Sequence, residues 1–275
     1  MKTEYFANQL LIENVRPQTL RNYKISINEL KKNMANSEAE PTKEDVVNYL
    51  ARLQQENYQS SSIARHLAAI KKYFLLVLES DLKIKSPKKQ LTQKIYLTKT
   101  ELKKILEKAS KYEKTLIQVY YDTGARFDEL AQSNKTDYDP KTGKIKTIGK
   151  GGIPAYLYFT YFPKETAQLL EQSFQNRKDK NPALLVGTYG GRLSNSTLNY
   201  ILRDLCKKCK ITKKVHAHIL RKTVGQHILE DTGDIFLASK KLRHKNVGVT
   251  QTSYADYSDD QVQKILGEKI SPGEN

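Results

Sequence analysis

The sequence predicts a mainly α-helical protein with a small β-sheet, in which a helical N-terminal domain precedes an α+β domain. Three observations support this fold class. Apolar residues recur every three or four positions through roughly the first ninety residues, and again from about residue 164 to residue 270. Segments with strand character are confined to about residues 138–160. A lysine-rich stretch without apolar periodicity separates the two parts.

Three helices account for the periodic part of the first domain. A helix over residues 17–34 has on one face Leu20, Tyr23, Ile27, Leu30 and Met34. A helix over residues 60–78 has a stripe made of Ile63, Leu67, Ile70, Phe74 and Val77. Between them, Thr42 is a candidate N-cap, with Asp45 three residues later. A packed bundle with basic outer faces satisfies all three patterns.

The domain boundaries follow from these patterns. We expect residues 1–82 to form the helical domain, 83–95 a basic linker, 96–257 the second domain and 258–275 a C-terminal tail helix. The linker contains Pro87 and lysines at positions 83, 85, 88 and 89, which either follow a phosphate backbone or are merely solvated. In the tail, Ser258 can cap a short helix whose apolar stripe docks on its own domain or on a neighbouring chain.

The second domain opens with the sequence TKTE, a capping box from Thr98 to Glu101. Further along, Ile145 and Ile148 precede the turn sequence GKGG, and the aromatic-rich segment IPAYLYF follows it. This order predicts a β-hairpin with Lys150 at its tip. From about residue 164 the helical periodicity returns.

The charge balance indicates a polyanionic partner. Lys and Arg number 47 against 30 Asp and Glu, which gives a formal net charge of +17. Neutralising phosphates with such a surface releases counterions and strengthens binding, although a merely soluble basic protein has the same composition. Two cysteines in 275 residues exclude a disulfide-dense scaffold, and no run approaches ~20 apolar residues. We therefore expect a cytoplasmic protein without a membrane partner.

Several common chemistries lack their motifs. The sequence contains no P-loop, no HExxH and no paired-carboxylate motif. Cys206 and Cys209 form a lone CxxC on an apolar helical stripe, which favours core packing over a zinc site. His66 lies within a helix and is interpreted as a solvated or hydrogen-bonded histidine. We expect neither a metal nor a cofactor.

Four segments carry chemically useful side chains: TGARFDEL, GKG, HILRKT and LRHKNVGVTQTSY. Their candidate residues are Arg126, Glu129, Lys150, His218, Arg221, His244 and Tyr254. Two guanidinium groups can hold the non-bridging oxygens of a phosphodiester and stabilise the charge of its transition state. A lysine can protonate the leaving 5′ oxygen, histidines can move protons near neutral pH, and a tyrosine can form a covalent link. Together these groups are suited to cleaving a phosphodiester without a metal.

In this order the segments resemble the tyrosine recombinase family, which includes the phage integrases and the Xer-type site-specific recombinases. TGARFDEL resembles TGxRxxEL, and IGKGG resembles the strand and turn of the catalytic lysine. The stretch HAHILRKTVGQHILEDTGDIFLASKKLRH resembles HxLRHTxAxxLLxxGxxxxxVxxxLGH, and VTQTSYADY resembles the tyrosine segment. The resemblance covers nearly the whole chain, and the first ninety residues are similar to the family's core-binding domain.

The resemblance implies a role for each candidate. Arg126 and Arg221 become phosphate ligands, Lys150 the general acid and Tyr254 the nucleophile, and the two histidine positions are taken by His218 and His244. Glu129 falls where the family has an acidic residue that supports the first arginine, although it is equally an ordinary surface carboxylate. By resemblance the partner and substrate is double-stranded DNA, on which four protomers assemble across two sites, and strand exchange passes through a 3′-phosphotyrosyl intermediate.

The chain departs from the family pattern in three places. GKGGIPA stands where GKGxKxR is usual, so the basic residues after Lys150 are missing. LRH replaces LGH, which puts Arg243 in the place of a glycine. The interval from His244 to Tyr254 is one residue longer than is common, so Tyr257 remains a competing nucleophile. His216 and His227 match no motif position and are expected to be structural or close to DNA.

Two other functions are compatible with these residues. A type IB topoisomerase-like enzyme uses the same chemistry but relaxes DNA as a monomer, without joining two specific sites. A non-catalytic DNA-binding protein on the same scaffold would form no covalent adduct.

Overall fold

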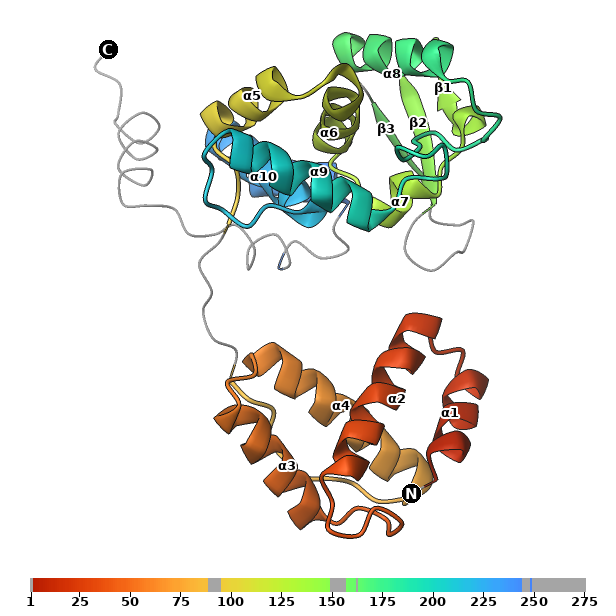
Figure 1. Cartoon of the computed structure of the whole chain (residues 1–275), viewed down its shortest axis with the longest axis vertical. Coiled ribbons are helices and arrows are strands. Elements are labelled where there is room, and N and C mark those ends of the chain that lie inside the picture. Colours follow the sequence, from red (N-terminus) through yellow and green to blue (C-terminus); the bar gives the residue numbers. More distant parts are fainter. Residues whose placement is uncertain (1, 89–94, 149–156, 162, 244–247, 249–275) are drawn as a thin grey trace, which may run out of the picture. The chain divides into compact units, whose positions relative to one another are not determined.

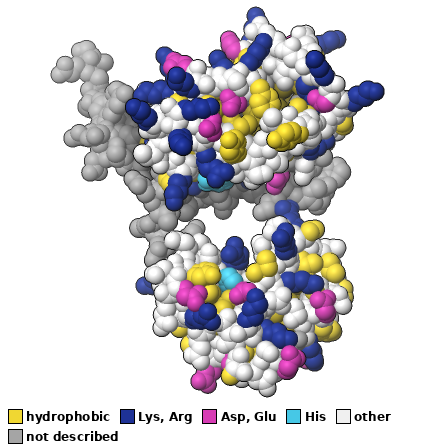
Figure 2. Space-filling view, viewed as in Figure 1, with side chains coloured by type: hydrophobic (Ala, Val, Ile, Leu, Met, Phe, Trp, Pro, Cys, Tyr) yellow, Lys and Arg dark blue, Asp and Glu magenta, His cyan; other side chains and the backbone are white. Residues whose placement is uncertain are grey.

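The computed structural model describes residues 2–88, 95–148, 157–161, 163–243 and 248 (Figure 1). The chain divides into two compact units, Met1–Thr92 and Gln93–Asn275. Among the described residues, no helix is both long enough and apolar enough to span a membrane. Figure 2 shows Lys and Arg side chains spread over the visible face of each unit, with fewer Asp and Glu among them.

The first unit is a bundle of four helices. They are α1 (Thr3–Ile12), α2 (Pro17–Lys32), α3 (Lys43–Gln55) and α4 (Ser60–Val77). The helices α2 and α4 pack together, and α1 and α3 pack against both. Completely buried side chains from all four helices fill the centre, among them Phe6, Ile27, Val46 and Ile70. The periodic stripes in the sequence therefore form one apolar core.

The capping box at Thr42 and the histidine at position 66 both have the geometry that the sequence indicated. Thr42 caps α3: its hydroxyl accepts the Asp45 N–H at 3.1 Å, while the Asp45 carboxylate accepts the Thr42 N–H at 2.9 Å. The side chain of His66 is buried, and its Nδ1 lies 2.8 Å from the hydroxyl of Tyr49. His66 is therefore a hydrogen-bonded core histidine. After α4 the chain has no regular structure up to residue 88, but Ile84 packs on the same core.

The second unit places a three-stranded antiparallel sheet among helices (Figure 1). In chain order its elements are α5 (Lys99–Lys108), α6 (Lys111–Thr123), α7 (Phe127–Ala131), the 3-10 turn Lys135–Asp137, β1 (Tyr138–Asp139), β2 (Lys144–Ile148), β3 (Leu157–Tyr161), α8 (Lys164–Asn176), α9 (Asn195–Lys208), α10 (Ala217–Thr232) and α11 (Ile235–Leu242). Strands β2 and β3 form the expected pair, with Ile145 opposite Thr160. The short β1 adds a strand that the sequence pattern did not indicate. The GKGG turn lies outside the described residues.

Helix α10 is the centre of the second unit. It packs against α6, α9 and α11, and most of its residues are buried, including the polar Thr223, Gln226 and His227. Two of these side chains bind the backbone of Leu97, near the start of the second unit. The Thr223 hydroxyl accepts the Leu97 N–H at 3.0 Å, and His227 Nε2 lies 2.8 Å from the Leu97 carbonyl oxygen. His227 is therefore structural. The following helix, α5, begins with the capping box expected at Thr98.

The two cysteines lie where the apolar stripe of α9 predicts. Cys206 is 3% exposed and belongs to the core of the second unit, and Cys209 is partly buried against that core. Burial raises the pKa of the Cys206 thiol to about 11, so it stays protonated at neutral pH. Within the described parts of the chain, no three His, Cys, Asp or Glu side chains are grouped closely enough to hold a metal ion.

Candidate active site

A left-handed glycine introduces the first arginine segment. Helix α6 ends at Thr123, and Gly124 follows it with φ of 57°. A β-carbon at position 124 would lie 3.2 Å from the Leu242 side chain, so both the backbone conformation and the close contact favour glycine. The chain then turns sharply and places Arg126 at the N-cap of α7.

Glu129 is a buried carboxylate that binds two arginines. It is 4% exposed, and its Oε2 accepts the backbone N–H of Arg126 at 2.9 Å. Its Oε1 lies 2.8 Å from Nη1 of Arg126, and its Oε2 lies 2.8 Å from Nη2 of Arg243. Burial alone raises the pKa of Glu129, but the Arg126 N–H and the two guanidinium charges hold that pKa below its ordinary value. Glu129 is therefore ionised at neutral pH.

Arg221 ties together three parts of the site. It is 2% exposed, on the buried side of α10. Its Nη1 donates to the Gly124 carbonyl at 2.5 Å, and its Nη2 donates to the Leu242 carbonyl. Because one of these carbonyls precedes Arg126 and the other precedes Arg243, the guanidinium fixes α10 to both segments. A planar group with donors on separate nitrogens is suited to such bridging.

His218 lies on the first turn of α10, before Arg221. Its ring is nearly parallel to that of His216, with 6.4 Å between the ring centroids and an interplanar angle of 10°. Desolvation by the surrounding protein lowers the pKa of His218, and the positive charges of Lys222, Arg221, His216 and Arg126 lower it further. Arg126, Arg221 and His218 therefore lie within electrostatic reach of one another, and His218 is neutral at pH 7.

Comparison with known proteins identifies the family. The sequence profile of the phage integrase family matches residues 95–261, and that of the phage integrase N-terminal SAM-like domain matches residues 3–79. The chain belongs to the phage integrase family. It is thus a tyrosine recombinase, a site-specific DNA strand transferase, and the expected mainly helical fold with a small sheet is confirmed.

Individual relatives of the recombinase span most of its length. Tyrosine recombinase XerC of Staphylococcus saprophyticus is 24% identical over 80% of this chain and 79% of its own. Tyrosine recombinase XerD of Oceanobacillus iheyensis is 25% identical over 75% of each chain. Among solved structures, the Tn1549 transposon integrase in complex with transposon right end DNA aligns with a TM-score of 0.78, at 15% identity, over 98% of this chain and 99% of that one.

The structure describes four of the residues that the sequence predicted for the site and brings them together: Arg126, Glu129, His218 and Arg221. Lys150, His244 and Tyr254 lie outside the described residues, as does the competing Tyr257. Glu129 is no surface carboxylate, because it is buried and bridges two arginines. His216 is the residue immediately before α10 and stacks on His218.

Arg243 is the residue of this site that the sequence did not assign. In the sequence, Arg243 is notable only because it stands where the family motif has a glycine. In the structure, its guanidinium contacts the carboxylate of Glu129, which also binds Arg126. One signal was available in the sequence. A charged side chain at a position that favours glycine needs a compensating contact, and the first of the four segments contains a carboxylate, Glu129.

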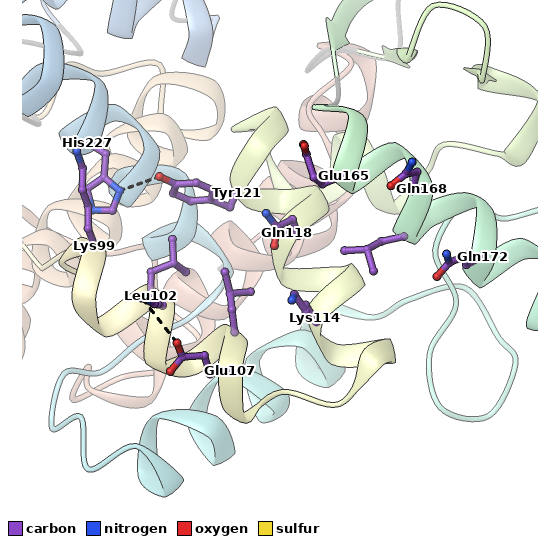
Figure 3. A pocket seen from close by; sticks show the side chains of 13 residues that line it. Lys99, Leu102, Glu107, Lys114, Gln118, Tyr121, Glu165, Gln168, Gln172 and His227 are labelled. Carbon is purple, nitrogen blue, oxygen red and sulfur yellow. Dashed lines mark hydrogen bonds and ion pairs between the residues drawn. The ribbon is translucent and has the colours of Figure 1, made fainter.

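A separate groove of about 690 Å³ lies between α5, α6 and α8 (Figure 3). His227 and Tyr121 are at one end, with 2.8 Å between His227 Nδ1 and the tyrosine hydroxyl, and Gln168 and Gln172 line the α8 side. Neither Arg126, His218 nor Arg221 lines this groove. It is therefore distinct from the arginine cluster.

Proposed function

We propose that Tyr254 attacks the scissile phosphorus of duplex DNA and that Arg126 and Arg221 hold the non-bridging oxygens. The tyrosine oxygen forms a bond to phosphorus while the bond to the 5′ oxygen breaks, which leaves a 3′-phosphotyrosyl link and a free 5′ hydroxyl. The reverse reaction, with the 5′ hydroxyl of another strand as nucleophile, rejoins the DNA. The observation that supports this most directly is the binding of Arg221 to the carbonyls of Gly124 and Leu242, because it draws three of the four motif segments to one place.

The remaining residues supply protons and charge. Lys150 is proposed to protonate the departing 5′ oxygen, and His218 and His244 to assist proton transfer and phosphate binding. A phosphate placed beside His218 would raise the pKa of its imidazole from the lowered value of the free protein. The two guanidiniums take the part that a divalent cation has in other phosphoryl-transfer enzymes, so the proposed reaction needs no metal.

DNA is the proposed substrate and partner. The Tn1549 integrase, whose fold matches over nearly the whole chain, was solved with DNA, and the net charge of +17 suits a polyanion. We assign the role of gripping the duplex to the first unit and catalysis to the second. We further propose that four protomers join two DNA sites, with the tail over residues 258–275 packing on a neighbour. A protein that relaxes supercoils as a monomer, without joining two sites, would contradict this assembly.

The proposal is tested with a nicked suicide substrate that traps the covalent intermediate, in a buffer containing EDTA. Wild type and Tyr257→Phe should form the adduct, whereas Tyr254→Phe should bind the same DNA and form none, because it lacks the attacking oxygen. An adduct that persists in Tyr254→Phe and disappears in Tyr257→Phe would transfer the role to Tyr257. Loss of cleavage by the wild type in EDTA would refute the metal-free mechanism.

A further inference from the structure

Arg243 has an unfavourable backbone conformation for an arginine. It is the C-cap of α11, with φ of 52° and ψ of 47°, in the left-handed region. This conformation is strained for a residue with a β-carbon and costs a glycine almost nothing. The motif that the segment resembles has glycine at this position, so an arginine here costs backbone free energy that its side-chain contacts must offset.

The side chain of Arg243 makes a buried ionic contact. Its Nη2 is 2.8 Å from Oε2 of Glu129, and 8% and 3% of the two side chains are exposed. The same carboxylate binds Arg126 through Oε1 and through the Arg126 N–H. One buried negative charge therefore lies between two positive charges. Glu129 and Arg243 are 114 residues apart in the sequence. Removing one partner of such a cluster is costly because the other charges remain desolvated.

We propose that Arg243 is a positioning residue for the cleavage step and acts on Arg126 through Glu129. Oε2 accepts from both Arg243 and the Arg126 N–H, so Oε1 remains for the Arg126 side chain, which is held by one nitrogen while 38% of it stays exposed. Without Arg243, Oε2 keeps only the Arg126 N–H and has room for a second donor. A bidentate pair with the Arg126 guanidinium can then form, which draws this group inward and offsets its charge. Arg243 thus keeps Arg126 directed outward to a phosphate.

The same contact connects the two ends of the site. Arg243 immediately precedes His244, and Glu129 lies one helical turn after Arg126. The ion pair thus fixes the start of the histidine and tyrosine segment relative to the first arginine. This inference rests on the proposed role of Arg126 as a phosphate ligand.

The principal test replaces Arg243 by glycine, which removes the guanidinium and also relieves the backbone cost. We expect Arg243→Gly to bind duplex DNA within about twofold of wild type, while its single-turnover cleavage rate on the suicide substrate falls by at least about tenfold. Arg243→Lys, which restores a positive charge, should recover part of the lost rate. The matched control is Lys210→Gly, which likewise removes a cation from a left-handed position (φ of 57°). The Lys210 side chain is exposed, unlike that of Arg243, so this variant should cleave normally.

A second comparison separates positioning from general stability. If Arg243 acts through Glu129, Glu129→Gln should slow cleavage to a similar extent and the double variant should be no slower than the worse single variant. Melting temperatures are measured for all variants, and rates are compared well below each of them. The proposal is overturned if Arg243→Gly has a lower melting temperature but cleaves at the wild-type rate. It is also overturned if the cleavage rate of the double variant, Arg243→Gly with Glu129→Gln, falls by the product of the two single-variant losses. The test of Tyr254 as the nucleophile is independent of the test of Arg243, because it is made in a chain that keeps Arg243.

Discussion

At the scale of single residues, Arg221 has two tasks that compete for one guanidinium. Its contacts with the carbonyls of Gly124 and Leu242 hold the scaffold, and its proposed role in catalysis requires further contacts with a phosphate. A guanidinium offers five N–H donors, so it can do both, whereas an ammonium has a single nitrogen. Charge alone is therefore insufficient at this position.

We predict that Arg221→Lys keeps DNA affinity within a few fold of wild type but slows cleavage by roughly a hundredfold, about the effect of losing one transition-state donor. The melting temperature should fall as well, because one buried carbonyl loses its donor. Single-turnover cleavage and thermal unfolding measure the two effects. The control is Arg203→Lys on the exposed side of α9, which should leave both unchanged. Normal cleavage by Arg221→Lys would show that the bridging geometry is unimportant.

The sequence predicted the residue types of this site better than their contacts. The spacing of His218 and Arg221 places them on one side of a helix, because helical spacing is local. The pairing of Glu129 with Arg243 joins segments 114 residues apart, and nothing in either motif encodes that distance. For the same reason the sequence left Glu129 open as a surface carboxylate, although it is buried.

At the scale of elements, the capping signals were predictable because they depend on four consecutive residues. The boxes at Thr42 and Thr98 form as expected. Helix α10 is different: its period indicated a helix, but burial of Thr223, Gln226 and His227 depends on partners elsewhere in the chain. Strand β1 consists of only two residues, Tyr138 and Asp139. Such a strand is too short to show the alternation of apolar and polar residues that identifies a strand in a sequence.

We predict that Thr98→Ala destabilises the second unit by about 1 kcal/mol, because the Glu101 N–H loses its acceptor at the start of α5. Thr100→Ala, at an exposed position within the first turn of the same helix, is the matched control and should be neutral or slightly stabilising. Urea unfolding of both variants measures the difference. Equal stability of the two variants would mean that the capping box contributes nothing.

At the scale of the whole molecule, buried histidines make the stability of each unit sensitive to acid. Burial lowers the pKa of His66 in the first unit and is the main cause of the lowered pKa of His227 in the second. Below about pH 6.5 the unfolded chain takes up protons that the folded chain does not bind, so the free energy of unfolding falls with decreasing pH. Glu129, whose pKa is lowered, stabilises the fold above its unfolded pKa and loses this effect only in stronger acid.

We predict that the free energy of unfolding decreases between pH 7.5 and about 5.5, and that His66→Gln and His227→Gln each reduce this decrease for the unit that contains them. Glutamine keeps a hydrogen-bonding side chain without the titration. Urea unfolding at several pH values gives the dependence of the free energy of unfolding on pH for each variant, and each variant is the control for the unit that it leaves unchanged. If the free energy of unfolding depends on pH equally in both variants and in the wild type, groups other than these two histidines cause the acid sensitivity.

The anchoring of Leu97 has a mechanical consequence. Leu97 is completely buried just after the segment that joins the two units, and both its N–H and its carbonyl are bound by side chains of α10. A tension applied along the joining segment therefore acts on the hydrogen bonds of Leu97 with Thr223 and His227 before it reaches α5. Since Thr223 is two residues from Arg221, stretching the chain between the units strains the same helix that carries the buried guanidinium.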